Sequence, residues 1–419
     1  MSDSSIDPRI DVLVVGGGIA GLWTLHVLLA HGFDAHLVEA EGLGAGQSVK
    51  SQGIVHGGGK YALRSVGDVD AMRAIRDMPE RWRLHHGGSR SDPDLRAARL
   101  LSDGCWLWLP KGSWFARLQA LGLVPLLRHG GLLACPPEPQ PRDAWPVVLQ
   151  THAQRALRMA EPVLDTRSVL EALREPVSDR LLQVDGAEGI GGFQRLDGSW
   201  RSTLRAPDGT CLSLETAALV FTAGRGNAAL LTGAERDPDL MQERPLLMTV
   251  LRGRLPALHG HCISGGRTRI TVTSVPDGDE VVWQVGGEVS ERNAEVVPGP
   301  ATQRAALDEI QACLPGIDLS GARIGHYRAV RAEARNVRVR RPSGAHVEAL
   351  ERGLIVAWPT KWALAPLLAE DVLAQLQSDG IRAHGPSAMH GSGRWPRPEV
   401  APFPWEDCAW TDVSSVARV

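Results

Sequence analysis

The feature that most constrains the fold is a glycine-rich turn near the start of the chain, between a predicted strand and a predicted helix. The apolar, β-branched run at 11–15 is typical of a buried parallel strand. Gly16, Gly18 and Gly21 follow with the spacing G-x-G-x-x-G, which permits a tight turn, close approach of a pyrophosphate, and packing of the helix on the strand. Apolar residues recur at helical spacing over 19–29. The helix therefore presents free backbone N–H groups and a positive dipole to a phosphate.

A second strand and an acidic residue complete this pattern. Gly32 ends the predicted helix, and the apolar run 35–38 leads to Glu39, which lies 18 residues beyond Gly21. A carboxylate about 20 residues beyond the glycines is expected to bind a ribose. The glycines alone could belong to an ordinary turn. With strand, helix, second strand and acid in register, the sequence predicts an adenine-dinucleotide site in a Rossmann-like α/β domain.

Composition excludes several other classes of protein. The chain has 419 residues, enough for two lobes, and its net charge of -3 gives no reason to expect a nucleic-acid partner. No apolar run approaches the length of an integral membrane segment, and the first ten residues lack an apolar signal core. The six cysteines form no C-x-x-C pair, and the 14 histidines are scattered. We therefore expect reduced thiols, a cytoplasmic protein and no metal site.

Lysine is unusually rare in this chain. Heavy use of arginine is typical of a genomic base bias, so a retained lysine can mark a place where arginine cannot serve. An ammonium group is compact and its pKa moves with burial, whereas a guanidinium is bulkier and always charged. Chance is the alternative explanation for so small a set. Only four of the 45 basic residues are lysines: Lys50, Lys60, Lys111 and Lys361.

The segment 44–61 is dense in glycine and small polar residues, which is typical of a backbone pressed against a flat or phosphate-rich group. It resembles the segment that follows the dinucleotide motif in FAD-dependent glycerol-3-phosphate dehydrogenases, and it is similar to a stretch of L-2-hydroxyglutarate oxidases. Both families belong to the D-amino-acid-oxidase-like flavoprotein superfamily. Lys50 replaces an arginine of the first family, and Gln52, Gly53 and Gly59 depart from its pattern. The residues that agree with it are Gly46, Ser48, Ser51, Ile54, His56, Gly57 and Gly58.

Two later segments resemble other parts of the same nucleotide domain. The segment 217–231 is predicted as a buried strand, the turn 222–224 and a helix, and the superfamily carries a similar turn where a strand passes the FAD. The segment 353–376 is predicted as a strand, the turn 358–361 and an amphipathic helix. In the superfamily this second turn lies against the pyrimidine end of the flavin, where amides and the helix dipole stabilise negative charge. The residues that depart from its usual glycine-rich pattern are Trp358, Pro359 and Lys361.

The resemblance implies an α/β fold with a discontinuous, Rossmann-like FAD-binding domain of the GR2 type and a second α+β substrate domain on a mixed or antiparallel sheet. The FAD-binding domain is predicted to comprise 1–75, 155–235 and 345–385, the substrate domain 76–154 and 236–344, and a C-terminal tail 386–419. The residues implied to contact FAD are Gly16, Gly18, Ile19, Ala20, Gly21, Glu39, Ala40, Gly46, Gln47, Ser48, Lys50, Ser51, Gln52, Gly53, His56, Gly57, Val163, Thr222, Ala223, Gly224, Pro359, Thr360 and Lys361.

Turn signals and alternating apolar residues predict the remaining strands. Asp-Gly turns at 185–186, 197–198 and 208–209 indicate a small antiparallel meander beside the nucleotide sheet. The strands predicted for the substrate lobe lie at 121–127, 132–134, 246–251, 268–274 and 281–285, with a helix at 301–313.

An arginine of the strand at 327–331 is the predicted substrate anchor. This strand precedes the last nucleotide segment, and amino-acid-oxidase-like enzymes carry a carboxylate-binding arginine at the similar place. Arg328 and Arg331 would share one side of the strand only through a bulge, so at most one can be the anchor, and Arg331 is the prediction. A solvated run of arginines is the alternative.

The predicted function is oxidation of a small polar substrate, an amino acid or another amine, by hydride transfer from a C–H bond to FAD. His56 would act near the ring as base or hydrogen-bond partner, or serve only as a structural residue of its loop. Lys361 would stabilise reduced FAD, or point outward. Lys60 would stabilise superoxide if oxygen is the acceptor, and Arg331 would bind a carboxylate or phosphate.

Two alternatives stay open. The segment 46–61 favours a 2-hydroxy acid or a glycerol-3-phosphate-like alcohol, and the fold is also used by FAD-binding scaffolds without redox turnover. No second G-x-G-x-x-G with a following strand and acid appears, which disfavours a pyridine-nucleotide-dependent enzyme. We expect a small-molecule substrate, and O2 or a quinone as electron acceptor. The Trp- and Pro-rich tail is expected to pack on its own chain or on a second subunit of a homo-oligomer.

Overall fold

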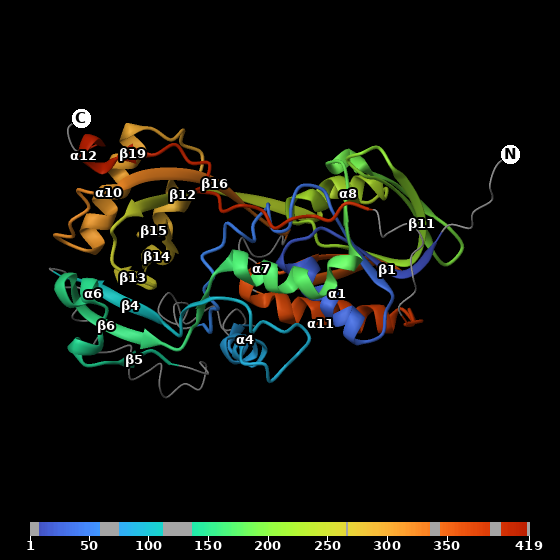
Figure 1. The fold of residues 1–419 in the computed structure, drawn as a ribbon, viewed down its shortest axis with the longest axis horizontal. Coiled ribbons are helices and arrows are strands. Elements are labelled where there is room, and N and C mark those ends of the chain that lie inside the picture. The colour runs from blue at the N-terminus through green and yellow to red at the C-terminus, as the bar shows by residue number, and fades with distance from the viewer. Residues whose placement is uncertain are drawn as a thin grey trace.

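Two large sheets organise the molecule, one in each of two lobes (Figure 1). The structure is a computed structural model, and it describes residues 8–58, 75–111, 136–264, 267–335, 344–385 and 395–416.

The first lobe is built on a mainly parallel sheet that is buried on both faces. Its strands are nearly continuous apolar runs because other elements cover each face. Side chains alternate across the sheet, so Val12 and Val14 face one core while Leu13 and Val15 face another. The order is β17 (His346–Glu351), β18 (Leu354–Trp358), β11 (Cys211–Phe221), β1 (Arg9–Val15), β2 (Ala35–Glu39) and β8 (Leu181–Gln183), and β17 is antiparallel to β18.

Helices cover one face of this sheet and a meander covers the other. The helices are α1 (Ile19–Ala30), α7 (Thr166–Arg174) and α11 (Ala365–Ser378), which lie together (Figure 1). Their apolar side chains share one core. The carboxylate of Asp165 accepts the N–H of Ser168 and caps α7. On the other face lie β9 (Ile190–Arg195), β10 (Trp200–Arg205) and α8 (Asn227–Gly233), with β10 paired antiparallel to β9 and β11. The predicted meander is therefore confirmed.

The second lobe is built on a largely antiparallel sheet. Trp108 and Trp283 are fully buried in its core beside the helix α10 (Pro300–Cys313), so both are packing residues. The predicted domain boundary near residue 155 falls within β6. The strand order is β19 (Thr411–Asp412), β16 (Arg323–Ala334), β12 (Met241–Gly253), β15 (Glu280–Gly286), β14 (Arg267–Asp277), β13 (Gly260–Ser264), β4 (Cys105–Pro110), β6 (Ala153–Met159) and β5 (Glu138–Pro139).

Shorter elements connect these layers. The helices are α4 (Met78–His86), α6 (Val147–His152), α9 (Glu288–Arg292) and α12 (Val413–Val416). A two-stranded sheet pairs β3 (Leu100–Ser102) with β7 (Val163–Leu164). The 3-10 segments are Arg142–Ala144, Glu175–Arg180, Ala187–Gly189, Gly224–Gly226, Pro238–Leu240 and Trp362–Leu364.

The described part of the tail packs on its own chain and touches both lobes. Val400 forms a bridge with Leu43, and the Trp395 indole N–H donates to the carbonyl of Gln183 in the first lobe. At its end β19 pairs with β16 of the second lobe. The tail therefore ties the two sheets together along their outside.

Several sequence predictions fall on parts of the chain that the structure does not describe. They include Lys60 and the predicted strands at 121–127 and 132–134. Among the described residues, five cysteines are free, and no helix is long and apolar enough to cross a membrane.

Candidate functional site

Three turns meet at the carboxyl ends of neighbouring parallel strands. Val15 of β1 is paired with Phe221 of β11, and Phe221 is paired with Val356 of β18. The turns after these strands therefore lie side by side, and the Thr222 hydroxyl donates to the Gly16 carbonyl over 2.9 Å. In an open α/β sheet this edge is where ligands bind.

The glycines of the first turn have the roles that their spacing predicts. Gly16 has a φ of +112°, and a Cβ there would lie 2.4 Å from the backbone of Ala223. A Cβ on Gly21 would lie 1.9 Å from the carbonyl oxygen of Gly16, so only glycine allows α1 to pack this closely on β1. A Cβ on Gly18 would meet only the Ser48 hydroxyl, at 3.2 Å. The surroundings of Gly18 are therefore less crowded than those of Gly16 and Gly21.

The first turn of α1 is suited to an anion. This turn carries no acidic side chain. Its N-cap residue is Gly18, which has no side chain that could cap the backbone N–H groups. Ser48 approaches from the loop at 43–58, and its Oγ accepts the Ile19 N–H over 2.9 Å. Ala20 and Gly21 complete the turn. A diphosphate would here meet backbone donors and the positive end of the helix dipole without a competing carboxylate in the turn.

Glu39 lies at the end of β2, beside the glycine turn. Its carboxylate accepts N–H groups from Gly17 over 2.6 Å and from Ala40 and Glu41 over 2.9 Å each. Burial raises the pKa of the Glu39 carboxyl, while the bonds from Glu41, Gly17 and Ala40 oppose that shift. This fixed carboxylate at the sheet edge fits the ribose of an adenine dinucleotide.

The loop at 43–58 crosses from the nucleotide turn to the second lobe. The Gln47 side-chain oxygen accepts the Ala332 N–H of β16 over 3.0 Å. The Gln52 amide donates to the carbonyls of Thr271 on β14 and Gln284 on β15, over 3.0 and 2.9 Å. Gln52, which departs from the family pattern, thus joins the loop to the substrate-lobe sheet.

The same loop is held against the segment after β6. Gly53 has a φ of +66°, and its carbonyl accepts the Leu164 N–H over 3.0 Å. Ile54 forms an antiparallel bridge with Val163, and the Val55 N–H donates to the carbonyl of Pro162. Ser51 Oγ accepts the Gly53 N–H over 3.4 Å, and the Lys50 carbonyl accepts the Tyr327 hydroxyl over 3.3 Å.

The loop brings His56 into a cluster with Glu161 and His261. Glu161 is 2% exposed, and its Oε2 lies 3.3 Å from His56 Nδ1. His261 comes from β13, is fully buried, and has its ring centroid 5.6 Å from that of His56. One nitrogen of each histidine and one oxygen of Glu161 lie within 4.8 Å of one another. These are also zinc ligand types, so the expected absence of a metal site stays a prediction.

Sequence reasoning missed Glu161 and His261. Glu161 is 105 residues from His56 along the chain, and His261 is 205 residues away, so no motif spacing links them. The available signal was weak: a carboxylate within the apolar run MAEPVL and a histidine within an alternating strand.

The turn after β18 is strained. Thr360 has a φ of +61°, which is uncommon for a residue other than glycine, and the Lys361 N–H donates to the Pro359 carbonyl over 2.5 Å. The Thr360 hydroxyl oxygen is buried and has no hydrogen-bond partner among the described residues. The Trp358 indole N–H donates to Gly224, joining this turn to 222–224. Strain and an unpaired buried hydroxyl at the sheet edge are consistent with a group that binds there.

The two candidate anchor arginines contact the chain around and after α9. Arg331 pairs with the Glu291 carboxylate over 3.3 Å, and Arg328 donates to the carbonyls of Ala294 and Val296. The pairing of β12 with β16 runs without a register shift past both residues. Arg331 directly precedes Ala332, whose N–H binds Gln47, so Arg331 lies near the loop at 43–58. Its role as the substrate anchor stays a prediction.

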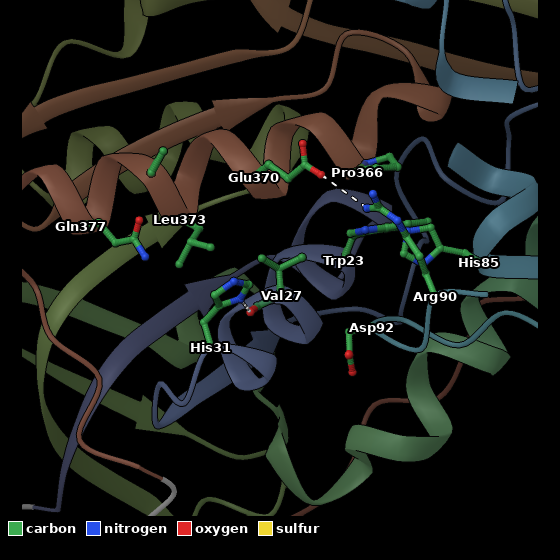
Figure 2. Close-up of a pocket in the computed structure, with 11 residues that line it drawn as sticks. Trp23, Val27, His31, His85, Arg90, Asp92, Pro366, Glu370, Leu373 and Gln377 are labelled. Carbon is green, nitrogen blue, oxygen red and sulfur yellow. Dashed lines mark hydrogen bonds and ion pairs between the residues drawn. The ribbon is translucent and has the colours of Figure 1, made fainter. Parts of the chain in front are cut away.

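A separate hollow of about 280 Å³ lies along α1 and α11 (Figure 2). Trp23 lines it from α1, His31 from the residue directly after α1, Glu370 from α11, and Arg90 from the loop after α4. None of the predicted FAD or catalytic residues lines this hollow. It is therefore distinct from the sheet edge where the three turns meet.

A Rossmann-like sheet, a discontinuous chain path through it and an antiparallel second lobe define the class of GR2-type flavoproteins. The model of the DAO family, described as FAD dependent oxidoreductase, matches residues 11–375. The chain therefore belongs to this family and is an FAD-dependent oxidoreductase. The donor set described above fits FAD: a helix N-terminus for the diphosphate, Glu39 for the ribose, and the strained turn at 359–361 for the ring.

Individual relatives agree with this assignment. The chain is 38% identical over 405 residues to the probable FAD-dependent oxidoreductase PA4991 of Pseudomonas aeruginosa, covering 94% of this chain and 97% of that one. The crystal structure of PA4991 superposes with a TM-score of 0.77 and 35% identity, over 96% of this chain and 99% of that one.

More distant structures share the fold. L-amino acid deaminase from Proteus vulgaris matches with a TM-score of 0.61 and 14% identity, over 90% of this chain and 92% of that one. Glycerol-3-phosphate dehydrogenase from Bacillus halodurans, complexed with FAD, matches with a TM-score of 0.53 and 16% identity, over 93% of this chain and 67% of that one. The predicted fold class and cofactor are thus confirmed.

Proposed function

We propose that the protein oxidises an amino acid or another small amine, with transfer of a hydride from the C–H bond beside the nitrogen to FAD. The observation that carries the proposal is the cluster of His56, Glu161 and His261 between the FAD loop and the substrate-lobe sheet. The fold of an L-amino acid deaminase over 90% of the chain supports it. In this proposal the segments 1–75, 155–235 and 345–385 bind FAD, and 76–154 and 236–344 cover the substrate.

The residues of the chain have separate tasks in this reaction. Bound FAD supplies the hydride acceptor. His56 takes the proton from the substrate nitrogen or oxygen through Nε2, because Nδ1 faces Glu161. Arg331 gives up its ion pair with Glu291 and binds the substrate carboxylate instead. Lys361 places positive charge beside the strained turn, where it would stabilise reduced FAD in a water-excluded site.

Oxidation of an alcohol is the second candidate. The proton of an alcohol hydroxyl must also be removed during oxidation, so the His56–Glu161 pair that supports amine oxidation would serve a 2-hydroxy acid or a glycerol-3-phosphate-like donor as well. The observation that favours this second candidate is the resemblance of 46–61 to glycerol-3-phosphate dehydrogenases. O2 or a quinone would then take the electrons, and Lys60 would stabilise superoxide if the acceptor is O2.

Anaerobic reduction tests these proposals directly. The purified holoprotein is mixed under nitrogen with amino acids, N-methyl amino acids, 2-hydroxy acids and glycerol 3-phosphate, and the flavin absorbance near the visible maximum is followed. Bleaching by an amine supports the first proposal, and bleaching by an alcohol alone overturns it in favour of the second. If no donor bleaches a flavin that dithionite does reduce, the scaffold alternative replaces both. Admission of air afterwards separates an oxidase from a dehydrogenase.

A further inference from the structure

We infer that Glu161 is a positioning residue that fixes the tautomer of His56, with the proton on Nδ1 and the lone pair on Nε2. The inference rests on the proposed role of His56 as the base. It deepens that role, because it names the residue that decides which ring nitrogen can accept a proton.

The two oxygens of Glu161 have different partners. Oε1 accepts the Gly57 N–H over 2.8 Å, and Oε2 lies 3.3 Å from His56 Nδ1. An ionised carboxylate can only accept hydrogen bonds. A neutral imidazole facing it must therefore carry its proton on Nδ1, which leaves Nε2 as the acceptor. The carboxylate thus organises two consecutive residues of the FAD loop.

The backbone on both sides keeps this arrangement in place. The loop strand 53–55 is hydrogen-bonded to 162–164, so His56 and Glu161 are held in fixed register. The Arg83 guanidinium of α4 donates to the carbonyl of Ala160, directly before Glu161. A Cβ on Gly57 would lie 2.8 Å from the Pro79 ring, so the loop packs closely on α4 at this point and a larger residue would not fit. Glu161 is therefore placed by the chain around it rather than by its own flexibility.

The second lobe contributes the third member of the group, His261. His261 Nδ1 lies 2.8 Å from the Thr271 hydroxyl of the neighbouring strand β14, which orients the His261 ring. That ring is tilted by 35° to His56. The His56 side chain is 15% exposed, whereas that of Glu161 is 2% exposed. Of the pair, His56 is therefore the one that a small substrate between the lobes can reach.

Exchange of the carboxylate for an amide separates this role from mere packing. Glu161→Gln keeps the size of the side chain but offers one acceptor oxygen and one donor NH2. Gly57 N–H still needs an acceptor, so the oxygen goes to Gly57 and the NH2 faces His56 Nδ1. Nδ1 must then accept, and the proton moves to Nε2. His56 is then still present, but its Nε2 carries a proton and cannot accept another. The same happens in other enzymes where an amide replaces the carboxylate hydrogen-bonded to a histidine.

Nitrogen NMR reads the tautomer without any turnover. The holoprotein is labelled with 15N-histidine, and the His56 ring signals are assigned by their loss in His56→Gln. In the unsubstituted protein we expect the proton on Nδ1; a proton on Nε2 overturns the inference even if Glu161→Gln does not fold. In Glu161→Gln we expect the proton on Nε2; an unchanged tautomer overturns it as well.

Kinetics supply the second readout. With the donor found by anaerobic bleaching, Glu161→Gln should lower kcat/KM by about 10²–10⁴-fold, the usual contribution of a general base, while the FAD content stays that of the unsubstituted protein. Glu171→Gln, on the exposed side of α7, is the matched control and should leave kcat/KM unchanged. Unaltered kcat/KM in Glu161→Gln overturns the inference. Failure of every donor would refute the proposed function instead, and the tautomer would still be measured.

Discussion

At the scale of single residues, Glu39 combines the clearest sequence signal with the most complete set of contacts. Its carboxylate holds three backbone N–H groups around the turn that faces the nucleotide. Glu39→Gln keeps the shape but removes the charge and one acceptor. Hydrogen bonds to a charged group contribute about 1.5–3 kcal/mol each, so we expect the Kd for FAD to rise by about 10- to 150-fold. Titration of apoprotein with FAD, followed by quenching of flavin fluorescence, measures this change.

The neighbouring residue provides the control for this prediction. Glu41 is exposed, and it contacts Glu39 through its backbone N–H rather than its side chain. Glu41→Gln should therefore bind FAD as the unsubstituted protein does. Equal affinity in Glu39→Gln and Glu41→Gln would show that the Glu39 carboxylate serves only to hold the turn and does not contact the ribose.

Residues with local partners could be predicted from the sequence, and residues with distant partners could not. Gly16, Gly21 and Glu39 belong to one strand–helix–strand unit, whose geometry follows from their spacing. Glu161 reaches His56 only because 162–164 pairs with 53–55, and His261 reaches it only because the two lobes fold against each other. Burial of an acid among apolar residues costs free energy unless it is paired. That cost is the physical reason to look for a partner, but it does not say which one.

At the scale of elements, the loop strand at 53–55 depends on a single backbone conformation. Gly53 has a φ of +66°, and a Cβ there would lie 2.0 Å from the carbonyl oxygen of Leu164. Gly53→Ala should therefore separate this loop from 162–164. We expect a loss of at least about 1–3 kcal/mol in the free energy of unfolding from the backbone conformation alone. Urea unfolding of the apoprotein measures it.

A second glycine of the same loop separates stability from binding. Gly46 has no atom within 4 Å of an added Cβ, and its φ is not in the left-handed region. Gly46→Ala should leave the unfolding of the apoprotein within about 0.5 kcal/mol of the original, while FAD binding weakens if this open side faces the cofactor. An equal loss of stability in Gly46→Ala and Gly53→Ala would contradict the assignment of the clash to Gly53.

Most elements could be predicted because their patterns are local, and the errors have local causes too. The buried strand predicted from residue 217 is the end of the longer strand β11 (Cys211–Phe221), because Glu215 and Thr216 continue the pairing with β10 and β1. The two arginines of β16 lie in an unshifted register with β12. Their long side chains nevertheless both reach the chain around α9, which backbone alternation alone does not predict.

At the scale of the whole molecule, each lobe carries a buried histidine that cannot easily accept a proton. Burial lowers the pKa of His259, before β13 of the second lobe, to about 4 from an ordinary 6.5. Burial and the nearby Arg180 guanidinium lower the pKa of His36, on β2 of the first lobe. The order of strands that buries these two residues is a property of the assembled sheets. The sequence therefore did not reveal either of them.

These histidines make both lobes sensitive to acid. Between about pH 6.5 and 4 these histidines are protonated in the unfolded chain but neutral in the folded protein. Proton binding therefore favours the unfolded chain, and the free energy of unfolding falls as the pH falls. Each such group contributes a slope of at most about 1.4 kcal/mol per pH unit. We expect Tm to drop from pH 7 to pH 5, and to drop less in His259→Gln. His346→Gln, at an exposed edge strand, should follow the unsubstituted protein. A glutamine side chain at 259 does not titrate. If Tm falls equally with pH in His259→Gln and in the unsubstituted protein, the acid sensitivity therefore comes from other groups.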